Sequence, residues 1–180
     1  GTLSEGDVVE GEYDYEKRQR TRANHSSLHL LQAALKKVLG DHIAQAGSYN
    51  CAEYGRFDFT HFEKPTEEQL NEVERLVNEQ IALAEPIITE VMDIEAAKNS
   101  GAIALFDEKY GDTVRVVSMG DFSKEFCGGT HANNTADLCV FKITSEESIG
   151  SGIRRIISET KFDAYKDFKD EEQYLLECAK

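Results

Sequence analysis

The sequence predicts an α+β fold in which a mainly antiparallel sheet has helices packed on one face. Two observations support this prediction. Short segments with alternating apolar residues come in pairs, as at 43–50 and 56–61, without a helix between the two members. Longer segments with helical periodicity, at 25–39 and 66–84, separate the strands.

The first helix is predicted from Asn24, a plausible N-cap, to Gly40, a plausible C′ residue. Before it, β-branched and aromatic residues alternate roughly over 8–15 and predict a strand. The apolar stripe of the helix consists of Leu28, Leu31, Leu35, Val38 and Leu39. A neighbouring stripe carries His25, His29, Gln32 and Lys36, so we expect the histidines to flank the core face and line a cleft.

Thr66 and Gln69 have capping-box spacing and start a second helix, expected to end near residue 84. Its inward residues should be Leu70, Val73, Val77, Ile81 and Leu83 or Ala84. Further strands are predicted at 86–91, 114–117, 138–144 and 153–158, with a short helix from Asp93 to about Gly101 and a last helix over 162–178.

The chain has 180 residues, of which 40% are hydrophobic and 30% charged. These values indicate a soluble, globular chain of one domain, with at most a small appendage. Its apolar runs are much shorter than the roughly 18 residues that span a membrane, and no signal peptide is recognisable. The sequence begins without Met, and we expect it to be a piece of a longer protein.

The net charge of −14 argues against non-specific nucleic-acid binding, because phosphate contacts need Lys and Arg. Basic residues nevertheless cluster before the first histidine, at Lys17, Arg18, Arg20 and Arg22. A locally basic groove on an acidic body is one interpretation. Composition alone favours the simpler one, which is solvated surface charge.

The histidines His25 and His29 are four residues apart, so on a helix both imidazoles can reach one point. Cys127 and His131 repeat this spacing far along the chain. Three imidazoles and one thiolate form a donor set that suits zinc. Our central hypothesis is that the two segments fold together around one zinc ion.

The glycines between Cys127 and His131 bear on that hypothesis. Gly128 and Gly129 let the backbone bend so that both side chains point the same way, and they can offer N–H groups to an oxyanion. Four protein ligands are typical of a closed structural site, whereas catalytic zinc keeps a position for water. The spacing alone leaves both possibilities open.

Other reactive side chains receive ordinary interpretations. His42 and His61 are expected to be structural or exposed, and Asp58 to lie on a solvated face. Gln45 is either a turn residue or a hydrogen-bonding partner of a substrate. The remaining cysteines, expected to be reduced core or surface residues, are Cys51, Cys139 and Cys178.

Several motifs together closely resemble the editing domain of alanyl-tRNA synthetases and its free-standing homologues, called AlaX. They occur in the same order at 24–31 (NHSSLHLL), 45–48 (QAGS), 56–59 (RFDF), 104–106 (ALF), 108–112 (EKYGD), 127–131 (CGGTH) and 152–156 (GIRRI). The resemblance runs from about Gly6 to Thr160. It is less close to the related threonyl-tRNA synthetase domain, which shares the His-x-x-x-His pattern.

The resemblance implies the α+β fold of the second additional domain of these synthetases. It also implies zinc-dependent hydrolysis of the ester that joins serine or glycine to alanine tRNA. The implied metal ligands are His25, His29, Cys127 and His131, and the implied catalytic residues are Gln45, His25, His29 and Cys127. The residues implied to contact substrate or tRNA are Gln45, Gly128, Gly129, Thr130, Arg154 and Arg155.

The resemblance further implies an editing domain over 1–160, beginning with the tail of a preceding barrel, and a helix at 161–180 that leads out of it. The expected partners are mischarged tRNA(Ala) and the rest of a cytoplasmic synthetase, with no membrane. Leu28 departs from the family, which commonly has threonine there, and 135–139 departs at a turn.

Three alternatives stay open beside this reading. The chain could be a free-standing deacylase, or a non-catalytic tRNA-binding module with a structural zinc. An ordinary zinc peptidase is disfavoured, because the histidine pair lacks the Glu of His-Glu-x-x-His.

Overall fold

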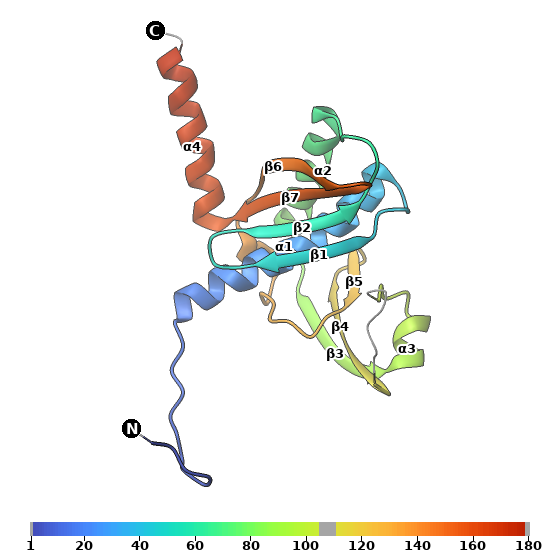
Figure 1. Cartoon of the computed structure of the whole chain (residues 1–180), viewed down its shortest axis with the longest axis vertical. Coiled ribbons are helices and arrows are strands. Elements are labelled where there is room, and N and C mark those ends of the chain that lie inside the picture. The colour runs from blue at the N-terminus through green and yellow to red at the C-terminus, as the bar shows by residue number, and fades with distance from the viewer. Residues whose placement is uncertain (1, 105–110, 179–180) are drawn as a thin grey trace.

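The computed structural model describes residues 2–104 and 111–178. The motifs at 104–106 and 108–112 therefore lie partly outside the described residues. The fold is α+β with two antiparallel sheets, rather than the single sheet expected (Figure 1). The four-stranded sheet has the order β1 (Gln45–Asn50), β2 (Gly55–Thr60), β7 (Ile153–Thr160) and β6 (Phe141–Gly150). The three-stranded sheet has the order β3 (Ile87–Asp93), β4 (Thr113–Met119) and β5 (Ser123–Phe126).

Four α-helices complete the described part: α1 (Tyr15–Leu39), α2 (Glu67–Ala82), α3 (Ile94–Asn99) and α4 (Lys161–Cys178), with a short 3₁₀ helix η1 (Thr135–Leu138). Helix α1 runs along the inner face of the four-stranded sheet beside α2 (Figure 1). The main core forms where Leu30 and Leu31 of α1 meet Phe57 and Phe59 of β2. A smaller core, which includes Val116 and Phe126, lies in the three-stranded sheet.

Helix α1 begins ten residues earlier than expected, and residues 8–14 do not form a strand. The N-cap is Asp14, whose carboxylate accepts a hydrogen bond from Lys17 N at 2.9 Å. Val8 is fully exposed, so the alternation at 8–15 has no sheet face to bury against. Alternating residues without a neighbouring strand do not make a stable strand.

Asn24, predicted as the N-cap, lies in the middle of α1 and is only 1% exposed. Its Nδ2 donates to the carbonyl oxygens of Cys51 and Ala52 at 3.0 and 3.2 Å. Its Oδ1 accepts from the Thr160 hydroxyl at 2.7 Å. One buried amide thus ties α1 to the β1–β2 turn and to the end of β7.

The capping box of α2 is confirmed, since Thr66 and Gln69 exchange hydrogen bonds between side chain and backbone. The inward positions Val73, Val77 and Ile81 are buried as predicted. Leu83 or Ala84 was expected to face inward, and both are exposed instead. The reason is that the helix ends at Ala82 and Ala84 takes a positive φ of 54°.

Strand β5 was not predicted from the sequence, because it is four residues long and carries Lys and Glu. The strand expected at 138–144 begins only at Phe141 and runs to Gly150, since η1 occupies 135–138. The other predicted strands and helices are present with small shifts at their ends. No helix in the described ranges is long and apolar enough to cross a membrane.

We expect Asn24→Ala to lower the free energy of unfolding by about 2–4 kcal/mol, because two carbonyls and a hydroxyl lose their buried partner. Urea denaturation in the presence of a chelator measures this without a contribution from bound metal. Asn71→Ala, an exposed position of α2, is the control and should change stability by less than about 0.5 kcal/mol. Equal effects of the two substitutions would contradict the role given to Asn24.

Candidate metal centre

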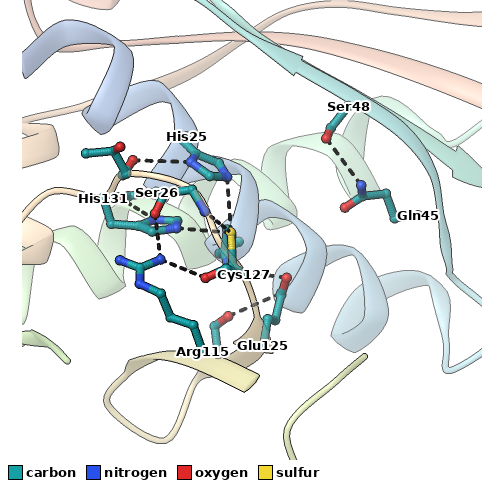
Figure 2. Close-up of polar contacts among 12 residues, drawn as sticks. His25, Ser26, Gln45, Ser48, Arg115, Glu125, Cys127 and His131 are labelled. Carbon is teal, nitrogen blue, oxygen red and sulfur yellow. Dashed lines mark hydrogen bonds and ion pairs between the residues drawn. The ribbon is translucent and has the colours of Figure 1, made fainter. Parts of the chain in front are cut away.

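Helix α1 and the loop after β5 bring His25, His29, Cys127 and His131 together, as hypothesised. Figure 2 shows His25, Cys127 and His131 of this cluster. One ligand atom from each residue lies within 4.8 Å of the others. Cys127 Sγ is 3.5 Å from His25 Nε2 and 3.3 Å from His131 Nε2. These separations match the edge of about 3.6 Å expected between nitrogen and sulfur in a tetrahedral zinc site. The cluster could therefore bind a metal ion.

Each imidazole has a partner near its other ring nitrogen. His25 Nδ1 lies 3.2 Å from the carbonyl oxygen of Thr130, and His131 Nδ1 lies 3.1 Å from Ser26 Oγ. His29 Nδ1 lies 3.3 Å from Glu125 Oε2, although the angles are not those of a hydrogen bond. Metal-binding histidines are usually oriented in this way by a carbonyl, hydroxyl or carboxylate.

The loop at 127–131, which carries Cys127 and His131 and is called the ligand loop below, is fixed mainly by Arg115 of β4. Its Nη1 donates to the carbonyl oxygens of Cys127 and Gly129 at 2.7 and 2.6 Å, and its own carbonyl accepts from Cys127 N at 3.0 Å. From α1, Arg22 Nε donates to the carbonyl oxygen of His131. The Gly129 N–H donates to Cys127 Sγ at 3.4 Å. These contacts set the position of both loop ligands.

Burial keeps the three imidazoles of the cluster uncharged before any metal binds. Burial and the neighbouring imidazole of His25 lower the pKa of His29 to about 3. The pKa of His131 is lowered to about 2 by burial and by the other two histidines, and burial also lowers the pKa of His25. Burial raises the pKa of the Glu125 carboxyl to about 8. The imidazoles are therefore neutral at pH 7, which is the form that binds a metal.

A cavity of about 220 Å³ opens beside the cluster. His25, His29 and Cys127 form part of its wall, whereas His131 lies behind them against Ser26. Gln45 and Ser48 of β1 belong to another part of the wall, and Gln45 Nε2 donates to Ser48 Oγ at 3.2 Å (Figure 2). A small molecule in this cavity would lie between the cluster and a polar strand.

The histidines were expected to flank the core face of α1. The structure buries His29 more deeply than that expectation. His29 is 6% exposed, and the helix is buried on nearly all sides from Ala23 to Leu35. The reason is that the loop after β5 covers the side of the helix that does not face the sheet. Leu28 belongs to the core and packs against Gly55, so it is not among the residues that line the cavity.

Asp58 was expected on a solvated face and is buried instead. Its carboxylate accepts from Arg155 at 2.7 and 2.9 Å on the neighbouring strand. Arg154 is also buried and pairs with Glu146 of β6. Both arginines thus hold the four-stranded sheet together and do not line the cavity.

The basic segment at the start of α1 is partly used inside the fold. Arg20 pairs with Asp163 of α4 at 2.8 Å, and Arg22 holds the ligand loop. His42 and His61 are exposed or nearly so, as expected, and their rings meet with 2.8 Å between Nε2 and Nδ1. Thr130 contributes its carbonyl to His25, and Gly128 lines the cavity.

Four functional residues were not singled out from the sequence: Ser26, Gln32, Arg115 and Glu125. Glu125 could have been found, because it stands two residues before Cys127 and alternation places both on one side of the strand. Arg115 within a run of valines was a further signal. Ser26 gave none, and Gln32 was predicted only as a member of the helix stripe that carries the histidines, since polar residues on helices are usually exposed.

The fold and the site define an α+β domain whose His₃Cys cluster, beside a small polar cavity, could bind a metal ion. Residues 114–157 match the model of the threonyl and alanyl tRNA synthetase second additional domain. The chain is 53% identical over 180 residues to alanine–tRNA ligase 1 of Lachnoclostridium phytofermentans, covering all of this chain and 20% of that protein. It is 51% identical over 179 residues to alanine–tRNA ligase of Streptococcus mutans, covering 99% of this chain and 20% of that protein.

A third relative, alanine–tRNA ligase of Legionella pneumophila, is 54% identical over 156 residues, which are 87% of this chain and 18% of that protein. The chain spans about a fifth of the length of these curated relatives. The chain is thus similar over nearly its whole length to part of these alanine–tRNA ligases, and residues 114–157 carry the match to the second additional domain.

We expect Gly129→Ala to weaken zinc binding by at least about 10-fold, the lower end of the effect of changing residues that orient metal ligands. A Cβ at Gly129 would stand 2.1 Å from His25 Cε1, so this imidazole must move. Gly128→Ala is the matched control, because its Cβ would meet nothing within 4 Å. Competition with a chromophoric chelator measures both affinities, and equal values would argue against His25 as a ligand.

Proposed function

We propose that this chain is a zinc-dependent deacylase domain that hydrolyses the ester joining serine or glycine to tRNA(Ala). The observation that carries the proposal is the meeting of His25, His29, Cys127 and His131, the first three of which form part of the wall of a small polar cavity. We assign the editing domain to 1–160 and a helix leading out of it to 161–180. The similarity to alanine–tRNA ligases supports this assignment.

Zinc fits the donor set better than the harder cations. Calcium and magnesium prefer oxygen ligands, whereas imidazole and thiolate suit zinc. In the proposed site His25, His29, Cys127 and His131 hold the ion, and Thr130, Ser26 and Glu125 orient the imidazoles. When bound, zinc would supply a Lewis acid close to the ester carbonyl.

The cavity supports a small acyl substrate. Pockets for drug-sized ligands measure roughly 300–1,000 Å³, and this one, at about 220 Å³, suits an aminoacyl group more than a whole nucleoside. Gln45 and Ser48 would orient the aminoacyl group from β1, and Gly128 would contact it from the loop. Hydrolysis adds water to the ester carbonyl and breaks its bond to the terminal ribose oxygen, giving a free amino acid and the tRNA hydroxyl.

Such an activity meets a physical need of a protein that selects alanine. A site that admits alanine cannot exclude the smaller glycine, and an apolar site rejects an added hydroxyl only by a factor of roughly 10–200. A second site that removes serine and glycine restores accuracy. The proposed partners are therefore mischarged tRNA(Ala) and the remaining parts of an alanine–tRNA ligase.

One observation favours a second candidate, a tRNA-binding module with a structural zinc. All four ligand atoms lie close enough for a closed tetrahedral shell, which is typical of structural sites. This module would bind tRNA without hydrolysing it and would unfold when its metal is removed.

We expect Cys127→Ala and His25→Ala to slow serine release from Ser-tRNA(Ala) by at least about 100-fold, because each removes a ligand that orients the reaction. Cys139→Ala and His61→Ala are matched controls outside the cluster and should retain the wild-type rate. Circular dichroism on the same samples verifies the fold. The structural-zinc candidate would be favoured if the wild-type chain bound tRNA but released no serine.

We also expect weak tRNA binding with a shallow dependence on salt. The net charge is −14, and Arg20, Arg154 and Arg155 are engaged in ion pairs. The slope of log K against log salt concentration should thus have a magnitude below about 3. Titration of labelled tRNA at several salt concentrations measures it, and a slope near that of a strongly basic binder would contradict this view of the surface.

A further inference from the structure

Gln32 is a buried polar residue that the contacts described so far do not explain. It is 2% exposed, and its Oε1 atom has no hydrogen-bond partner in the structure. A buried acceptor without a partner is unfavourable, because it loses its water without replacement. Such groups are few in folded proteins and require an explanation.

The position of Gln32 links it to the candidate metal centre. It follows His29 by three residues and His25 by seven, so all three share one face of α1. Gln32 lines the 220 Å³ cavity together with these histidines. It also lines an adjoining cavity of about 290 Å³, and Gln45 and Ile103 border both spaces as well.

The side chain has the freedom to serve a ligand in this cavity. The last torsion of a glutamine is broad, so a turn of the amide about it can present the oxygen to the cavity. The neutral amide oxygen is an acceptor of two hydrogen bonds and suits a neutral donor such as a hydroxyl. Among the amino acids of the proposed substrates, serine carries such a hydroxyl on its side chain.

We propose that Gln32 is a specificity-determining residue whose amide oxygen accepts a hydrogen bond from the hydroxyl of the seryl group. This inference rests on the proposed function and adds the group that recognises the substrate. The α-ammonium group is a less suitable partner for discrimination, because serine, glycine and alanine all carry it.

The same contact explains how one cavity could accept serine and glycine but disfavour alanine. The hydroxyl of serine satisfies the amide oxygen directly. Glycine leaves space beside Gln32 that a water molecule can fill, since such a site is polar. The methyl group of alanine would occupy that space and leave the oxygen without a donor, and sites built around a hydroxyl reject analogues that lack it.

The test compares the zinc-loaded wild-type chain with Gln32→Met, which nearly conserves the volume of the side chain. The probes are serine and alanine, each joined through a stable amide to 3′-amino-3′-deoxyadenosine, and calorimetry gives both dissociation constants. We expect the wild type to prefer the seryl compound and Gln32→Met to reduce that preference by about 10-fold or more. Gln173→Met, exposed on α4, is the matched control and should leave the preference unchanged.

Thermal unfolding adds a readout that a merely structural role would not produce. Gln32→Met removes an unsatisfied buried amide, so its melting temperature should be unchanged or higher while selectivity falls. A loss of stability with an unchanged seryl preference would overturn the inference, as would a wild type that does not distinguish the two compounds. Since each ratio is taken within one variant, partial unfolding does not alter it.

Hydrolysis of Ser-tRNA(Ala) by the wild type, measured alongside, tests the proposed function separately. Hydrolysis with no change of preference in Gln32→Met would refute the role of Gln32 alone. Selective seryl binding without hydrolysis would refute the deacylase and retain the role of Gln32 in recognition.

Discussion

The structure depends on the attachment of the ligand loop to the middle of α1. Ser26 makes this attachment with one hydroxyl, which accepts from the backbone N–H of Ala132 at 3.0 Å and contacts His131 Nδ1. Arg115 secures two loop carbonyls from β4, and Arg22 secures a third from α1 itself. Since these contacts are made by residues other than the four candidate ligands, the cluster is assembled by the fold itself. A site preorganised in this way loses little entropy when it binds its ion.

The sequence was sufficient to predict the four residues of the cluster and most of the helices and strands. The i, i+4 histidine pair and the Cys-Gly-Gly-Thr-His segment identified the four residues that the structure brings together. Helical periodicity located α2, which buries Val73, Val77 and Ile81, and alternation of apolar residues located the β1–β2 pair. The helix and strand patterns are local in the chain, and the candidate ligand set follows from the chemistry of its side chains. A single sequence is therefore enough to predict both.

The features that could not be predicted depend on contacts distant in the chain. Asn24 looked like a cap, because nothing nearby shows that Thr160 and the β1–β2 turn would supply partners inside the protein. Asp58 looked solvated, because its arginine partner is 97 residues away. Residues 8–15 carry a strand pattern, but a pattern does not provide a neighbouring strand. The unpaired oxygen of Gln32 is visible only once the whole helix is seen to be covered.

The candidate ligands come from two segments that are distant in the chain. His25 and His29 belong to the helix that packs on the four-stranded sheet, and Cys127 follows directly on Phe126 of the smaller core and packs against the main core. An ion held by all four residues would cross-link segments about a hundred positions apart and shorten the effective loop between them. Ion occupancy would then couple the unfolding of the ligand loop to that of α1, and the thermal transition of the loaded protein would be at least as cooperative as that of the metal-free protein.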